Sequence, residues 1–290
     1  MNILICSDGS ELAENAVKFA ALLAPSGKAA VTLLGVVEKT GDEAPLLDAL
    51  RREMQFLKDK NIDVELITKN GEPVTEIKKH TARNAYDLVL IGAEYKGRTG
   101  PFVMSMKAYK LIKIIEAPVL VVVGKPARLR RMLICSGGRS YIDKAVDLAG
   151  WIAAAAGAGI TLFHVLPEPP ALYANMIEIS SDTGGLLASH SALGRNLRHE
   201  KDTLEKLGIG VEVKLAHGEV GDRILDEVRS GDYDLIIAGS APGSGALRTY
   251  LMGNVTSEIV NRSQLPVLVV RGIAQNQPAG FWGFLRRLRG

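Results

Sequence analysis

The sequence is poor in the residues and patterns that define several protein classes. It has two cysteines, Cys6 and Cys135, too few for a disulfide framework or a zinc site built from cysteine. Both fall inside apolar runs, which favours small core side chains. No apolar run approaches the roughly 20 residues that a membrane-spanning helix needs. The sequence therefore predicts neither a disulfide scaffold nor a transmembrane helix.

Charge of one sign is also scarce. The formal net charge is +3, and three of the arginines stand in the closing residues 286–289. The rest of the chain is close to neutral and has no basic stripe, so we expect no nucleic-acid partner. The first residues lack the basic and apolar segments of a secretory signal, and the expected location is the cytoplasm.

Catalytic and metal-binding motifs are missing as well. There is no Walker lysine and no nucleophile elbow, and no two histidines have a spacing that places them on one helix face. Isolated histidines are more often hydrogen-bonded structural residues than catalysts. We expect no metal site and no catalytic residue, and a binding or regulatory protein is favoured over an enzyme. The histidines are His80, His164, His190, His199 and His217.

What the sequence does contain is an internal repeat. ILICSDGSELAENAVKFAALLA at 3–24 returns as MLICSGGRSYIDKAVDLAGWIA at 132–153. Four more pairs follow in the same order, at 31–38 and 160–168, 62–77 and 209–224, 86–93 and 233–240, and 117–124 and 265–272. Such a match predicts two copies of one domain. We expect domain 1 at 1–124, a linker at 125–131, domain 2 at 132–272 and a basic, aromatic tail at 273–290.

Each copy alternates short Val, Ile and Leu runs with stretches of helical spacing. This pattern predicts an α/β fold in which each domain is a doubly wound, Rossmann-like parallel sheet of five strands. Helices are expected around 45–60 in domain 1 and near 186–207 in domain 2. The last strands, PVLVVV and PVLVVR, would be exposed apolar edges. We therefore expect them to pair with each other and make a pseudo-twofold dimer within one chain.

Ligands of open α/β sheets bind at the carboxyl ends of the strands. In domain 2 the segment 238–260 carries Gly239, Gly243 and Gly253 in a loop that leads into a helix. Glycines let the backbone approach a phosphate, and the amides of the first helical residues bind anions. These residues are Asn254, Val255 and Thr256. The alternative interpretation is a glycine loop that only caps the helix.

The glycine pattern resembles that of the universal stress protein family, whose ATP-binding members carry G-x2-G-x9-G-[ST] at this place. The spacing from Gly243 to Gly253 fits, whereas the spacing from Gly239 to Gly243 is one residue too long. Asn254 replaces the usual hydroxyl residue, although it retains the ability to cap the helix and to bind a phosphate. Domain 1 has Ser105 and Met106 at these positions, so little ATP binding is expected there.

The loop after the first strand shows the opposite distribution. Domain 1 has Asp8 in a D-G-S sequence, and the resemblance implies an Asp near the adenosine part of the nucleotide. A helix N-cap is the alternative role for Asp8, and both roles are compatible. Domain 2 has Ser136 and Gly137 instead, and these two residues, with Val165 at the end of its second strand, complete the candidate site.

The resemblance implies a cytoplasmic stress-response protein that binds ATP or another adenine nucleotide through domain 2, with Mg²⁺ only as its companion. Two alternatives stay open: a nucleotide-free scaffold with both sites vestigial, and a hydrolase of the related adenine nucleotide superfamily. Further candidate partners are an unknown protein and a second copy of the chain. Segment 168–185 could form a lid, and residues 281–289 could contact a membrane weakly.

Overall fold

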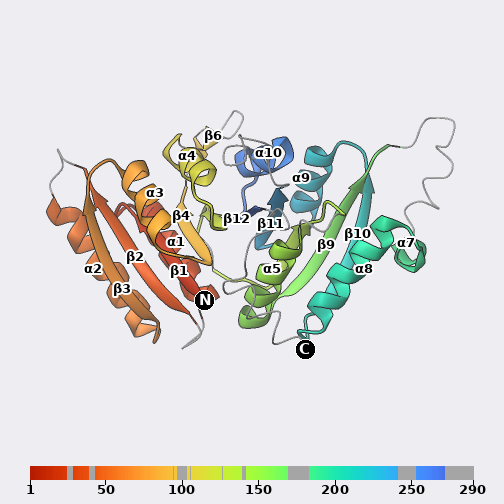
Figure 1. The fold of residues 1–290 in the computed structure, drawn as a ribbon, viewed down its shortest axis with the longest axis horizontal. Helices are drawn as coiled ribbons and strands as arrows, with labels where there is room; N and C mark the ends of the chain where they lie inside the picture. The colour runs from red at the N-terminus through yellow and green to blue at the C-terminus, as the bar shows by residue number, and fades with distance from the viewer. Residues whose placement is uncertain are drawn as a thin grey trace.

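The computed structural model describes residues 1–24, 29–38, 43–93, 95–96, 103–104, 106–125, 127–138, 142–168, 183–240 and 253–271. Two α/β halves lie side by side and share one sheet (Figure 1). In the described residues no helix is both long and apolar enough to cross a bilayer.

Domain 1 contributes five strands in the order β3-β2-β1-β4-β7, all parallel. A two-stranded ribbon, β5 (Tyr95–Lys96) and β6 (Val103–Met104), follows β4. The remaining elements are β1 (Asn2–Ser7), α1 (Glu11–Leu23), β2 (Ala30–Val37), α2 (Glu43–Asp59), β3 (Asp63–Asn70), α3 (Pro73–Arg83), β4 (Leu88–Gly92), α4 (Met106–Ile114) and β7 (Val119–Val122).

Domain 2 repeats this arrangement in the order β10-β9-β8-β11-β12, again parallel. Five strands in each domain confirm the predicted fold class. The elements are β8 (Arg131–Cys135), α5 (Asp143–Ala156), β9 (Gly159–Leu166), α7 (Thr183–Ala188), α8 (Ala192–Glu205), β10 (Val211–His217), α9 (Val220–Ser230), β11 (Leu235–Ser240), α10 (Asn254–Arg262) and β12 (Val267–Arg271).

The helix predicted near 186–207 was wrong in one respect, because the structure has two helices there, α7 and α8. Ser191 separates them. Its side chain accepts a hydrogen bond from the backbone N–H of Gly194 at 3.0 Å and so caps a new helix. The helix expected around 45–60 is α2, which begins two residues earlier.

The two halves join through their last strands. β7 and β12 pair antiparallel, with Leu120 opposite Leu268, and both leucines are fully buried. Arg271 of β12 donates to the carbonyl oxygens of Ile112 and Lys113, the latter at 2.6 Å, near the end of α4. A cation at a helix C-terminus is favourable. The predicted pairing through the last strands is therefore present.

Helices cover both faces of the sheet, as a doubly wound fold requires. One core layer contains the buried faces of α1, α2, α5 and α8. The other contains those of α3, α4, α9 and α10. Alternate residues of each central strand point into different layers: Ile3 and Ile5 face the first, and Leu4 faces the second. Loops at the carboxyl ends of the strands are thereby held between two packed layers.

Candidate functional site

In domain 1 the carboxyl ends of β1, β2 and β4 surround a cavity of about 650 Å³. Its floor is apolar and its rim carries three charged side chains, Asp8, Glu38 and Lys107. The apolar lining comes from the ends of β2 and β4 and from helices α3 and α4. Its members include Leu34, Val36, Val74, Ile77, Ile91 and Leu111. A cavity of this size, apolar with a few polar groups at its edge, has the character of a small-molecule site.

Asp8 lies on the wall of this cavity and does not cap α1. The cap is Ser10, whose Oγ accepts from the N–H of Ala13 at 3.3 Å. Asp8 Oδ1 accepts from the N–H of Ser10 at 3.1 Å, which fixes the turn before the helix. Of the two roles considered for Asp8, the N-cap was therefore wrong. Its carboxylate is exposed and lines the cavity.

The described charged side chains that line the domain 1 cavity are two carboxylates and one ammonium. Lys107, at the first turn of α4, donates to Glu38 Oε1 at 2.6 Å, and this hydrogen bond raises the pKa of the Lys107 ammonium. Among the lining residues that the structure describes, the cation Lys107 is thus matched by Glu38, while the carboxylate of Asp8 adds a further negative charge. Such a rim disfavours a triphosphate and suits the uncharged part of a ligand.

In domain 2 the start of α10 carries backbone donors that have no hydrogen-bond partner among the described residues. The first intrahelical bond runs from the N–H of Ser257 to the carbonyl of Gly253 at 2.9 Å. The amides of the three preceding residues therefore have no partner within the helix; they belong to Asn254, Val255 and Thr256. The cap position is Gly253, which has no side chain to satisfy them, so the capping role expected of Asn254 was wrong.

The other glycines of this segment fall on both sides of the described boundary. Gly239 is the second-to-last residue of β11, and a Cβ there would lie 3.1 Å from Ile142 Cγ1. Gly243 lies outside the described residues. The backbone at Gly253 has φ −56° and ψ 152°, and nothing described lies within 4 Å of a Cβ placed there. Thr256 is buried, whereas Asn254 is exposed.

The loop after β8 is held from several sides. Ser136 Oγ accepts from the N–H of Gly138 and donates to Glu200 Oε1, both at 3.1 Å. His164 Nδ1 bonds the Ser136 carbonyl at 2.8 Å, and Asn196 Nδ2 donates to the Gly138 carbonyl at 2.7 Å. The hydroxyl of Ser136 is thus engaged inside the protein.

The two remaining candidate residues of domain 2 are Gly137 and Val165. Gly137 is exposed at the tip of the loop after β8. Val165 is buried near the end of β9, at the position that Val36 occupies in the repeat of domain 1, and Val36 lines the cavity there.

Sequence reasoning missed a serine–glutamate pair that occurs once in each domain. Ser7 Oγ donates to Glu53 Oε1 at 3.0 Å, as Ser136 Oγ does to Glu200. Burial raises the pKa of both carboxyls to about 7. A signal was present, because LRREMQFL at 50–57 and LRHEKDTL at 197–204 share L-R-x-E-x3-L. The two stretches lie outside the five matched segments of the repeat.

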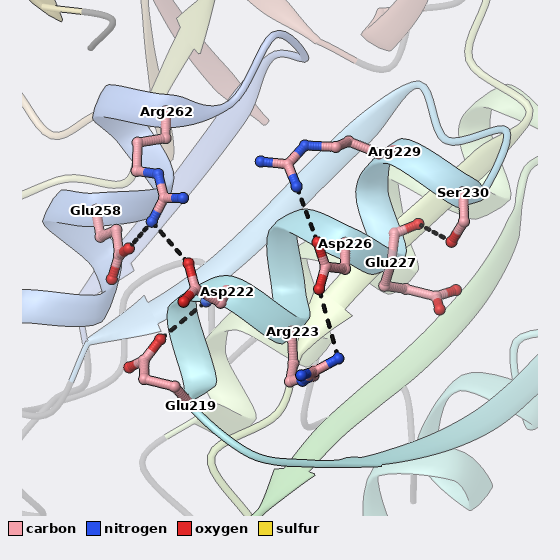
Figure 2. A network of polar contacts seen from close by, with 9 residues as sticks. All are labelled: Glu219, Asp222, Arg223, Asp226, Glu227, Arg229, Ser230, Glu258 and Arg262. Atoms are coloured by element: carbon pink, nitrogen blue, oxygen red, sulfur yellow. Dashed lines mark hydrogen bonds and ion pairs between the residues drawn. The ribbon is translucent and has the colours of Figure 1, made fainter.

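A second grouping unseen in the sequence lies between α9 and α10. Carboxylates of Glu219, Asp222 and Glu258 come within 4.8 Å of one another. Figure 2 shows the Arg262 side chain directed at two of them. It donates to Asp222 at 3.0 Å and to Glu258 one turn away on α10. The cluster therefore has a cation of its own, and it joins α10 to the helix before it.

The histidines and cysteines have structural surroundings. His80 bonds the hydroxyl of Tyr86 at 2.7 Å, and His217 contacts the Pro167 carbonyl at 3.2 Å. Burial raises the pKa of the Cys6 and Cys135 thiols to about 12, so neither supplies a thiolate at neutral pH.

A family model of universal stress proteins matches residues 1–123 and 128–271. The chain belongs to the universal stress protein family. The curated universal stress protein Slr1230 of Synechocystis is 22% identical over 307 residues, which cover 93% of this chain and 99% of that protein. YxiE of Bacillus subtilis is 28% identical over 152 residues, 49% of this chain and 98% of that protein.

A solved structure with the same overall fold comes from Archaeoglobus fulgidus. This universal stress protein is 19% identical, with a TM-score of 0.67, over 93% of this chain and 98% of that one. The likeness extends over both halves. It shows that the paired arrangement of two domains occurs in an experimental structure of the family.

Proposed function

We propose that this universal stress protein is a regulatory protein that binds ATP or another adenine nucleotide, with the phosphates held at the start of α10 in domain 2. The observation that carries the proposal is the set of amides of Asn254, Val255 and Thr256, which have no partner within the helix or from a side chain at the cap position Gly253 in the described part of the chain. Amides at a helix N-terminus and the positive end of the helix dipole favour a phosphate. The glycine pattern of the preceding loop, Gly239 with Gly243 and Gly253, points to the same ligand.

The nucleoside part of this ligand would lie toward β8 and β9. Gly137 leaves the loop tip without a side chain, and Val165 offers an apolar surface at the end of β9. The acidic contact that Asp8 provides in domain 1 has no counterpart at Gly137. Domain 2 is therefore proposed to bind chiefly through backbone and phosphate contacts, with Mg²⁺ only as the companion of the nucleotide.

For domain 1 we propose a ligand without a triphosphate. The cavity places Asp8 beside an apolar floor, and the Lys107–Glu38 pair occupies the rim near the start of α4. Adenosine fits this description, because the ribose hydroxyls are donors for a carboxylate and the base is a flat, largely apolar surface.

A nucleotide-free scaffold is the second candidate function. The observation in its favour is the continuous ten-stranded sheet through β7 and β12, which gives the chain a rigid frame without any ligand. The two functions differ in whether purified protein retains or takes up nucleotide.

The test compares two glycine substitutions by ATP calorimetry and by mass spectrometry of ligand released from purified protein. At both Gly253 and Gly210 a Cβ meets no described atom within 4 Å, so Gly253→Met and Gly210→Met are both expected to fold. Gly253→Met places a large side chain beside the α10 amides and is expected to weaken ATP binding by more than about tenfold. Gly210→Met is expected to bind as the unmodified chain does.

Two results would change the proposal. Full ATP binding by Gly253→Met would mean that the phosphates lie elsewhere. Absence of bound nucleotide and of any calorimetric signal in the unmodified chain would leave the scaffold function.

A further inference from the structure

The same arrangement of three residues occurs behind both ligand-facing loops. A serine stands at the carboxyl end of the first strand, as the last residue of β1 in domain 1 and directly after β8 in domain 2. Its hydroxyl accepts from the N–H of the glycine two residues later, at 3.1 Å in each domain. That serine donates to a glutamate on a helix between the second and third strands, α2 in domain 1 and α8 in domain 2. In domain 1 the residues are Ser7, Gly9 and Glu53, and in domain 2 they are Ser136, Gly138 and Glu200.

The glycine in each arrangement is in the left-handed region, with φ +75° at Gly9 and +64° at Gly138. Its place against the helix is tight. A Cβ at Gly9 would stand 3.0 Å from Ala49 Cβ, and one at Gly138 would stand 2.4 Å from Leu193 Cδ1. The helix that carries the glutamate therefore packs directly on the loop, and the glutamate reaches the base of that loop.

The surroundings of the two carboxyls are almost closed to solvent. Glu53 is 5% exposed and Glu200 is 2% exposed, and in each the second oxygen, Oε2, has no hydrogen-bond partner among the described residues. A buried carboxylate with one oxygen unpartnered is costly, and the neutral carboxyl avoids most of that cost.

Nearby charges do not offset this cost. The negative charges of Asp8 and Glu14 raise the pKa of Glu53, and the positive charge of Arg52 on the same helix opposes them only partly. On Glu200 the nearby charge is that of Asp143, also negative. These groups belong to the loop after β1, to α1, to α2 and to α5. The neutral form of each carboxyl is favoured by burial first and by these charges second.

The pair is retained where neighbouring positions differ. Asp8 is replaced by Gly137 in the second copy, and Ala49 is replaced by Asn196. A leucine in place of the glutamate would pack in the same layer without a desolvation cost. In both domains a buried glutamate carboxyl accepts a hydrogen bond from the loop serine. This retention indicates that the carboxyl acts on the loop rather than in core packing.

We propose that Glu53 and Glu200 are positioning residues that hold the ligand-facing loops after β1 and β8 through the hydroxyls of Ser7 and Ser136. The identity of the ligand rests on the proposed function above, whereas the holding of the loops does not. Burial raises the pKa of both carboxyls to about 7, although the serine hydrogen bond by itself lowers it. Because ionisation of a buried carboxyl is costly, the closed loops loosen as the pH rises through that value.

Hydrogen–deuterium exchange of the ligand-free, full chain tests the positioning directly. The loop peptides covering residues 3–12 and 132–138 are followed at pH 6 and pH 8, with intrinsic exchange rates divided out. Ionisation of the carboxyl in the closed loop should make opening about tenfold more favourable at pH 8 than at pH 6. The α3 and α9 peptides, remote from both carboxyls in sequence, report any global change.

Four variants separate positioning from packing. Glu53→Gln and Glu200→Gln keep an acceptor for the serine hydroxyl, so exchange should stay slow and lose its pH dependence. Glu53→Leu and Glu200→Leu remove the acceptor, so exchange should be fast at both pH values. Glu205→Gln, on α8 with a side chain that is 42% exposed, is the matched control and should behave as the unmodified chain.

Unchanged pH dependence in the Gln variants, or slow exchange in the Leu variants, would overturn the proposal. ATP calorimetry at the two pH values is a separate arm. If the unmodified chain binds no ATP but its loops loosen with pH as described, the proposed function fails while the positioning role stands. If ATP binds but the loops exchange at intrinsic rates, the positioning role fails alone.

Discussion

The two domains share one frame and differ where a ligand would meet them. Both have five strands in the same order. In both, a serine–glutamate pair lies beneath the loop that follows the first strand. Domain 1 has a charged rim with Asp8 and Lys107, whereas domain 2 has an uncapped helix behind Gly253. The duplication thus preserved the groups that hold the backbone and changed those that face the ligand.

The helices on the second face of the sheet, α3 with α4 and α9 with α10, also share some contacts and differ in others. Glu72 and Glu219 cap α3 and α9 in equivalent positions. In domain 2 the last turn of α10 carries Arg262, which bonds Asp222 (Figure 2). The last turn of α4 carries Ile114, which packs against the core. The caps are common to both copies, and the contacts between the helices are specific to each.

The largest expected effect tests whether the β7 and β12 sides of the junction contribute equally to the free energy of unfolding. Leu120→Ala and Leu268→Ala each remove a fully buried side chain from the β7–β12 pair and should each cost about 2–5 kcal/mol of unfolding free energy. Urea denaturation followed by circular dichroism measures this. Leu207→Ala, at a side chain whose residue is 42% exposed, is the control and should change stability by less than about 1 kcal/mol. A large cost at only one leucine would break the symmetry.

The next effect concerns pH and should be equal in the two domains. The folded-state pKa of Glu53 and Glu200 is about 7, above the ordinary value of 4.5, so the folded chain binds these protons more tightly. Their stabilisation is complete below pH 4.5 and is lost as the pH rises through about 7, by roughly 3 kcal/mol per carboxyl at most.

Denaturation of Glu53→Gln and Glu200→Gln at pH 5 and pH 8 measures this effect. Each variant should gain on the unmodified chain at pH 8 and match it at pH 5. A gain of the same size at both pH values would show that ionisation is not the cause.

The smallest effect should distinguish the domains. A Cβ at Gly92 would stand 2.2 Å from the Leu12 carbonyl oxygen, which belongs to the backbone of α1. At the equivalent Gly239 the nearest atom is Ile142 Cγ1 at 3.1 Å, and that side chain has room to adjust. Gly92→Ala should cost about 1–3 kcal/mol and Gly239→Ala less than about 1 kcal/mol. Thermal unfolding of the two variants measures the difference, and equal costs would contradict it.

Much of the fold could be predicted because its signals are local. Apolar runs such as 3–6 and 235–238 report strands buried on both faces, and their repetition reports the duplication. The break between α7 and α8 could not be predicted from periodicity alone, since it depends on Ser191 bonding the Gly194 amide. The caps at Ser10 and Gly253 likewise depended on where the helix backbone starts.

The candidate site was predicted less well than the fold. Asp8 lines the domain 1 cavity, and its predicted role toward a ligand stays a prediction. The sequence could not tell whether Asp8 or Ser10 caps α1. The pairs Ser7–Glu53 and Ser136–Glu200 join residues 46 and 64 positions apart. The shared L-R-x-E-x3-L stretch marks each glutamate in the sequence, but it does not identify the serine partner, which is fixed only when the helix packs on the loop.

The sequence by itself determined which segments form strands, that the domain is duplicated, and which family the chain belongs to. Each of these depends on patterns that neighbouring residues carry. Only the tertiary structure decided that α2 and α8 bring a buried carboxyl beneath each loop, and that a cavity of about 650 Å³ opens in domain 1. Both depend on how side chains from distant elements fill space, and packing of that kind is a property of the assembled layers.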